Sequence, residues 1–157
     1  MLETNEEPIF VAVYDQNIEQ VTNLLEGGAS VQTRHISGDF VIHTAARSGQ
    51  VEMAQLLIQF GANVNEQDHD LNTPLHLAAQ LMDTTLAQLL LDNRANPNNE
   101  NAHGQTPLMA ATFFNHYNVA QVLLKGRALV SEKCLCQRYN ANHNIRLFRA
   151  NIHIWAT

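Results

Sequence analysis

Histidines and cysteines are the residues of this chain best suited to acid–base or metal chemistry, and their spacing shows whether they could form such a site. The chain has eight histidines and two cysteines, and Cys134 and Cys136 stand one residue apart, with His143 and His153 nearby. Structural zinc sites usually separate paired cysteines by two residues, so this spacing does not match them. We therefore expect no metal and no cofactor.

Sequence motifs of common catalytic sites do not occur in the chain. There is no glycine-rich phosphate loop, no GxSxG nucleophile motif and no HExxH zinc motif. Asp68 and Asp70 share one polar turn, which we interpret as a solvated loop and not as a catalytic carboxylate pair. The sequence predicts a protein without catalytic residues. An enzyme or metal-binding protein using Cys134 and Cys136 is the alternative.

Charge is distributed unevenly, and this bears on the kind of partner. Residues 1–124 carry a net charge of −11 and residues 125–157 a net charge of +5, which together give −6. Because phosphate contacts need clustered lysine and arginine, the acidic part disfavours nucleic acid as a partner. The basic end either neutralises the acidic part or contacts an acidic partner.

The sequence also suggests a location. No apolar run approaches the ~18 residues of a membrane helix, and the acidic start MLETNEEPIF is unlike a signal peptide. Two cysteines form no disulfide framework, which fits a reducing compartment. We expect a cytoplasmic protein with no membrane association.

A repeat of 33 residues organises most of the chain. The first half of each unit reads EPIFVAV, FVIHTAA, TPLHLAA or TPLMAAT, and these segments begin at Glu7, Phe40, Thr73 and Thr106. The second half stays in register, with leucines at Leu24, Leu57, Leu90 and Leu123. Four copies in one frame predict stacked units that share a continuous core.

Each unit has the features of two short helices. Thr73 can cap a helix, and Pro74 follows at the first helical position, where a missing N–H costs nothing. Ala78 is small enough to let a neighbouring helix approach closely. Apolar residues between 51 and 58 have helical spacing, and Gly61 can end that helix in a left-handed conformation.

The period and the TPLHLAA segment resemble the ankyrin-repeat family, whose units carry TPLHxAA, an LL-containing helix and a GAxxN turn. The resemblance covers about residues 5–131. It implies an all-α ankyrin-repeat solenoid of stacked antiparallel helix pairs joined by extended β-turn or hairpin loops.

The resemblance also implies the domain organisation. Residues 1–131 should hold four repeats, at about 1–34 (an N-terminal capping repeat), 35–67, 68–100 and 101–131. Residues 132–157 leave the register but stay apolar and basic, so we expect a non-repeat C-terminal capping tail. A role in partner binding or self-association is the alternative for this tail.

Several turns lack the glycine of the family pattern. At Arg94 and Arg127 we expect the preceding residue, Asn93 or Gly126, to take the left-handed conformation. A non-glycine residue with positive φ costs roughly 1 kcal/mol. We therefore expect reshaped loops, above all in the third copy, at the other substituted positions, which are Leu71, Met82 and Asn115.

The histidines fall into two groups in the ankyrin frame. His43 and His76 occupy the TPLH position, which implies a structural role in hydrogen bonding to neighbouring backbone. His35, His69 and His103 lie near successive turn tips and should form a surface row. A pH-sensitive binding edge is the alternative, since an unperturbed histidine titrates near pH ~6.5.

The resemblance implies a protein–protein interaction module, such as an adaptor, scaffold or inhibitor, that is a monomer unless the tail self-associates. A bacterial effector that acts on a host protein in the host cytosol is a subtype, suggested by abundant asparagine and glutamine. Binding would use the turn tips and the exposed side of each first helix, here called the concave face.

Concave-face positions differ between copies, whereas core positions repeat. Arg47 would suit a carboxylate on the partner, while Phe113 and Phe114 either anchor a partner or turn inward against the tail. The residues expected to bind the partner are Tyr14, Ile36, Asp39, Arg47, His69, Asp70, Asn72, Gln80, Leu81, His103, Gln105, Phe113 and Phe114.

Overall fold

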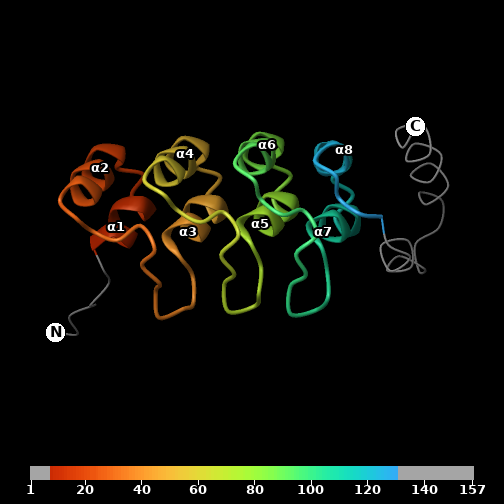
Figure 1. Ribbon diagram of the computed structural model, residues 1–157, viewed down its shortest axis with the longest axis horizontal. Coiled ribbons are helices and arrows are strands. Elements are labelled where there is room, and N and C mark those ends of the chain that lie inside the picture. Colours follow the sequence, from red (N-terminus) through yellow and green to blue (C-terminus); the bar gives the residue numbers. More distant parts are fainter. Residues whose placement is uncertain (1–7, 131–157) are drawn as a thin grey trace.

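The computed structural model of the protein describes residues 8–130 (Figure 1). This part of the chain contains eight helices arranged as four pairs. The helices are α1 (Pro8–Tyr14), α2 (Ile18–Glu26), α3 (Val41–Arg47), α4 (Val51–Gln59), α5 (Pro74–Gln80), α6 (Thr84–Asp92), α7 (Pro107–Phe113) and α8 (Tyr117–Lys125).

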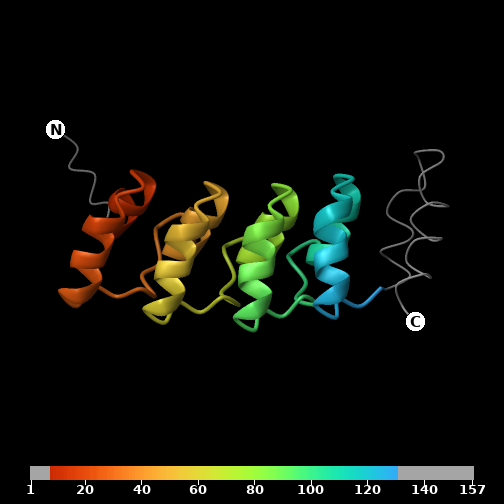
Figure 2. The same ribbon diagram turned by 90° about the horizontal axis from the view of Figure 1, so that it is seen from above.

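The helices form two layers. The first helices of the pairs, α1, α3, α5 and α7, lie in one row, and the second helices, α2, α4, α6 and α8, lie in another (Figure 1). The pairs follow one another along the long axis, as the turned view shows (Figure 2). Loops between pairs project beyond the first-helix row (Figure 1). This arrangement confirms the predicted all-α solenoid of stacked helix pairs.

Small and branched apolar residues build one core through all four pairs. Leu75, Ala78 and Ala79 are each 0% exposed, which confirms the inward face predicted for this helix. Leu57 and Leu90, in equivalent second helices, are also fully buried. Because alanines leave room for the neighbouring backbone, each first helix packs directly against the next. None of the helices between residues 8 and 130 is long and apolar enough to cross a membrane.

The predicted helix starts are confirmed. Pro107 occupies the first turn of α7, and the Thr106 hydroxyl accepts the Met109 N–H at 3.3 Å. Pro74 stands in the same place in α5, where the Thr73 hydroxyl lies 2.9 Å from His76 Nδ1. The starts of α5 and α7 are therefore set locally, by residues that satisfy or remove unpaired N–H groups.

The three projecting loops share one backbone pattern, although their sequences differ. In each, an N–H bonds to a carbonyl four residues later, and these bonds of 2.8 to 3.0 Å begin at His35, Asp68 and Asn101. Leu71 takes φ 58° without disturbing this bond. Met82 and Asn115 likewise adopt positive φ, at 61° and 62°. The expectation of reshaped loops is wrong, because the packed helices fix the path between them.

Two second helices end one residue later than predicted. Arg94 and Arg127 themselves take the left-handed conformation, at φ 68° and 67°, whereas Asn93 (φ −97°) and Gly126 (φ −76°) do not. Packing gives the reason. Ala95 is buried and its N–H reaches back to the last turn of α6, which fixes the residue that must reverse the chain.

Gly126 has a different role from the one predicted. A Cβ atom at this position would lie 2.7 Å from Leu91 Cδ1, closer than real carbon contacts. Gly126 therefore allows the end of α8 to approach α6. The predicted capping tail, residues 132–157, lies outside the described residues.

Candidate functional site

A groove of about 310 Å³ lies between the projecting loops and the first helices of the second, third and fourth repeats. Loops 67–73 and 100–106 form one wall, and the ends of α3, α5 and α7 form the other. The groove brings together eight of the residues predicted to bind a partner. Its lining is Arg47, Asp70, Asn72, Gln80, Asn101, His103, Gln105, Ala110, Phe113 and Phe114.

Asp68 holds the first loop wall in place. Its side chain is 0% exposed, and its Oδ1 atom accepts the N–H groups of Asp70 (2.9 Å) and Asn72 (2.8 Å). The interpretation of Asp68 as part of a solvated loop is wrong. Its carboxylate replaces water as the acceptor for two backbone donors, so the loop folds around it. Asp70, by contrast, is exposed as expected.

Asn101 repeats this arrangement one unit later. Its Oδ1 atom accepts the N–H groups of His103 and Gln105, both at 3.0 Å. Its Nδ2 atom donates to Asn72 Oδ1 at 3.0 Å, which links the two loops. Asn72 is consequently only 8% exposed, and its side chain serves mainly to join the two loops. The sequence carried a signal for Asn101, because it stands 33 residues after Asp68.

Arg47 is already paired within the protein. Its Nη2 atom lies 2.7 Å from Asp68 Oδ2 and 3.2 Å from Asp39 Oδ1. Two carboxylates therefore balance the one guanidinium charge, and the Asp39 side chain is only 20% exposed. These ion pairs contradict the prediction that Arg47 is available to pair with a carboxylate on a partner. The ion pairs anchor the end of α3 to the adjoining loops.

His43 and His76 connect successive repeats. Nε2 of His43 lies 3.1 Å from the Asn72 carbonyl, and Nε2 of His76 lies 2.9 Å from the Gln105 carbonyl. In each ring Nδ1 accepts the backbone N–H three residues earlier, so Nε2 must carry the proton and donate. Burial lowers the pKa of both rings, which favours this neutral form. The predicted structural role is confirmed.

The helix wall of the groove is aromatic. Phe113 and Phe114 are 51% and 48% exposed, and their rings meet edge to face with centroids 5.1 Å apart. The ring of His116 stacks on Phe114 at 5.7 Å, and its Nδ1 donates to the Ala79 carbonyl at 2.8 Å. Leu81, at the end of α5, is 51% exposed. Packing of the two phenylalanines against the tail, the alternative for these residues, lies outside the described residues.

The comparison with known families decides the identity. A family model described as ankyrin repeats (3 copies) matches residues 9–101 and, in a second match, residues 67–134. The chain belongs to the ankyrin-repeat family. Ankyrin-repeat proteins are generally protein–protein interaction modules and are typically not enzymes. Among curated proteins, no sequence matches the chain.

The turn-tip histidines of this ankyrin-repeat protein do not form a uniform row. His35 is partly buried, with its ring 5.1 Å from the Phe10 ring and its Nδ1 atom 2.8 Å from Ser37 Oγ. His69 is exposed and lies 3.4 Å from an Asp70 oxygen, whereas His103 lines the groove. Equivalent positions in the repeat therefore have different surroundings.

The remaining predicted contacts lie nearer the first repeat. Tyr14 is 73% exposed and lines a smaller hollow of about 260 Å³ together with Asp39. Ile36 is fully exposed at the tip of its loop. Of these two hollows on the concave face of residues 8–130, the larger one holds most of the predicted residues.

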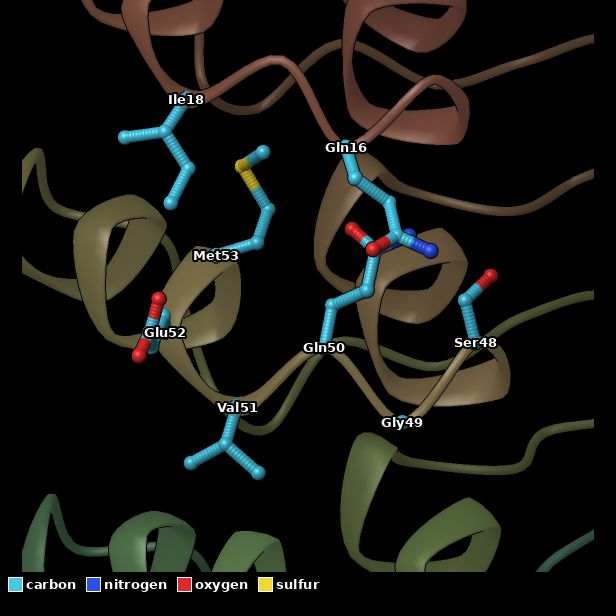
Figure 3. A pocket seen from close by; sticks show the side chains of 8 residues that line it. All are labelled: Gln16, Ile18, Ser48, Gly49, Gln50, Val51, Glu52 and Met53. Carbon is cyan, nitrogen blue, oxygen red and sulfur yellow. The ribbon is translucent and has the colours of Figure 1, made fainter.

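A further hollow of about 430 Å³ lies at the opposite edge of the ankyrin stack (Figure 3). The ends of the first two helix pairs form it, and the amides of Gln16 and Gln50 point into the same space (Figure 3). Within residues 8–130, both amide atoms of Gln50 are buried without a hydrogen-bond partner. Glu52 is the hollow's only acidic lining residue. In residues 8–130 no three His, Cys, Asp or Glu side chains group as metal ligands.

Proposed function

We propose that this ankyrin-repeat protein binds another protein through its concave face, chiefly through the groove between the second and fourth repeats. It would act as an adaptor, scaffold or inhibitor. A monomeric protein of the cytoplasm fits this proposal, as does an effector in the cytosol of a host. The abundance of asparagine and glutamine and the scarcity of lysine support the effector role.

The observation that carries the proposal is the exposed aromatic pair. Phe113 and Phe114 remain half exposed although the neighbouring alanines of α7 are buried. Aromatic side chains are enriched in the centres of protein interfaces, and grouped exposed apolar residues usually mark such a site. Beside them, loops held by internal hydrogen bonds form a rigid wall. A preorganised surface of this kind loses little conformational entropy when it binds.

Affinity purification from the native cell tests the proposal. The full chain is compared with a variant carrying Leu81→Ala and Phe113→Ala, and with Phe60→Ala as a matched control. Phe60 is also exposed, at 38%, but ends α4 outside the groove. A specific protein should be retained by the wild type and the control and lost by the double variant.

Thermal melting of the three proteins should show that all are folded. Since both substituted side chains are exposed, their removal should change stability little. Each interface anchor should contribute roughly 1–2 kcal/mol to binding. Retention of the same proteins by the double variant would contradict binding through this groove.

A further inference from the structure

We propose that the segment which fills this groove carries a basic side chain next to an aromatic or aliphatic one. The basic group would pair with Asp70, and the apolar group would cover Phe113 and Phe114. This inference rests on the proposed function and adds the chemistry of the partner.

Asp70 is the anion of the groove that remains accessible. Its side chain is 51% exposed, and its one ion-pair contact within the described residues is His69 Nε2, at 3.4 Å. Arg47, the cation that lines the same groove, is already held by two carboxylates. Among residues 8–130, no lysine or arginine forms an ion pair with Asp70, so a basic group brought by a partner can take that position.

The charge distribution over the rest of the described residues also favours a basic partner segment. Residues 8–130 contain eleven acidic and five basic residues, a net charge of −6. On the first helices, their following turns and the three projecting loops, there are six acidic residues and two arginines. Both arginines are engaged, because Arg34 Nε donates to the Gly38 carbonyl and Arg47 pairs with aspartates. The resulting negative field would attract a basic segment before contact.

The position of Asp70 is fixed before any partner arrives. Its backbone N–H donates to Asp68 Oδ1 at 2.9 Å, and its carbonyl accepts the Ala102 N–H at 2.8 Å. The loop is therefore held on both sides, and Asp70 lines the same groove of about 310 Å³ as Phe113 and Phe114. This volume is at the small end of ligand pockets, which hold ~300–1,000 Å³. It suits one or two side chains from an extended segment.

Other partner chemistries fit this groove less well. An acidic segment would bring a carboxylate toward Asp70 while Arg47 is already neutralised, and like charges at an interface are strongly unfavourable. A purely apolar segment would cover the Asp70 carboxylate without giving it a partner, which costs free energy through lost hydration. A cation beside an apolar group can pair with Asp70 on the loop wall and pack on Phe113 and Phe114 on the helix wall.

A peptide-display selection on the full chain tests the inference. A library of random 12-residue peptides is panned against the wild-type protein, and enriched peptides are synthesised with a fluorescent label. We expect them to contain lysine or arginine within a few positions of an aromatic or aliphatic residue. Binding is then measured by fluorescence anisotropy at low and high salt.

Two variants and two controls measure separately how much the loop wall and the helix wall of the groove contribute to peptide affinity. Asp70→Asn should weaken the enriched peptides about threefold to fivefold, and the loss should shrink at high salt. Phe113→Ala should weaken them about tenfold. The controls are Glu52→Gln, an exposed acid at the opposite edge, and Phe60→Ala, and both should bind as the wild type does.

The outcomes separate this inference from the proposed function. Peptides that lose affinity with Phe113→Ala but lack basic residues, or ignore Asp70→Asn, would overturn the inference and leave the groove as the binding site. No enrichment, or enriched peptides that ignore both variants, would overturn both. A synthetic peptide of residues 144–156, which contains two arginines beside apolar residues, serves as a competitor. If it displaces the enriched peptides with equal affinity, the occupant is the chain itself and not a separate partner.

Discussion

The contact between the first and second repeats differs from the contacts that follow it. In the later contacts a buried histidine donates across the interface, from His43 to Asn72 and from His76 to Gln105. In the first contact Phe10 occupies the equivalent position and packs its ring on His35. Helices of the same length and order thus carry different interactions.

The opposite edge of the stack shows the same contrast. His116 donates to the Ala79 carbonyl across the third and fourth repeats. Gln50, in the equivalent position between the first and second repeats, has a buried amide that finds no hydrogen-bond partner among the described residues. A repeated sequence therefore fixes the backbone path, while single substitutions decide how strongly each pair of repeats is joined. In a linear array of repeats, the strength of each contact between neighbours determines which repeat unfolds first.

The largest expected effect comes from removing a histidine of the later contacts. His76→Ala should lower the free energy of unfolding by about 2–4 kcal/mol, because it leaves buried groups unpaired and opens a cavity. Urea unfolding followed by circular dichroism measures the change. His103→Ala, at an exposed turn tip, is the control and should cost less than ~0.5 kcal/mol. If both variants lowered the free energy of unfolding equally, the histidine hydrogen bonds would not distinguish the later contacts from the first.

Acid should weaken the later contacts first. Burial lowers the folded-state pKa of His43 and His76 below 6.5, the ordinary value for a histidine. The unfolded chain therefore binds more protons in the window below pH 6.5, so stability is complete above that window and falls as pH decreases toward the folded pKa. Urea unfolding at pH 7.5 and pH 5.5 should show this loss. A His43→Phe and His76→Phe double variant, which resembles the first contact, should lose less on acidification.

Overpacking a helix of the middle repeats tests the close approach of the stack. Ala78→Leu should cost about 1–3 kcal/mol, since Ala78 is fully buried between neighbouring helices. The equivalent change Ala12→Leu, in the helix of the first repeat, should cost less because that contact is less tightly bonded. An unchanged melting temperature for Ala78→Leu would contradict the packing described here.

The smallest expected effect is a reciprocal exchange at the opposite edge. Gln50→His should raise the free energy of unfolding by about 0.5–1 kcal/mol if the ring finds a carbonyl as His116 does. His116→Gln should lower it by a similar amount. Differential scanning calorimetry of both variants measures the pair of changes. If neither variant shifts the unfolding temperature, the two positions are energetically equivalent and the contrast fails.

Residues that act locally were predictable. Thr106 and Pro107 start a helix through neighbouring backbone groups, and the apolar positions of each helix follow from its period. The roles of His43 and His76 came from the family resemblance. Binding by the predicted concave-face residues stays a prediction, although the structure places eight of them around one groove.

Residues whose partners lie in another repeat were not predictable in the same way. Asp68 was expected to be solvated and is buried, and Arg47 was expected to be free and is paired. Both results depend on a contact 21 residues apart in the chain, which no local pattern encodes. The left-handed turns at Arg94 and Arg127 were missed for a related reason, because buried alanines fix them through packing.

The sequence by itself determined the 33-residue unit, its two helices and their order, because these depend on capping, on helical spacing and on apolar residues repeated in one frame. Only the tertiary structure decided which polar side chains form hydrogen bonds or ion pairs between repeats and which stay accessible to solvent. Stacking brings Arg47 to Asp68 and Asn101 to Asn72, and it leaves Asp70, Phe113 and Phe114 exposed around the groove. The physical reason is that a polar group pairs with whatever packing places within hydrogen-bond distance, and that distance is set by the stack.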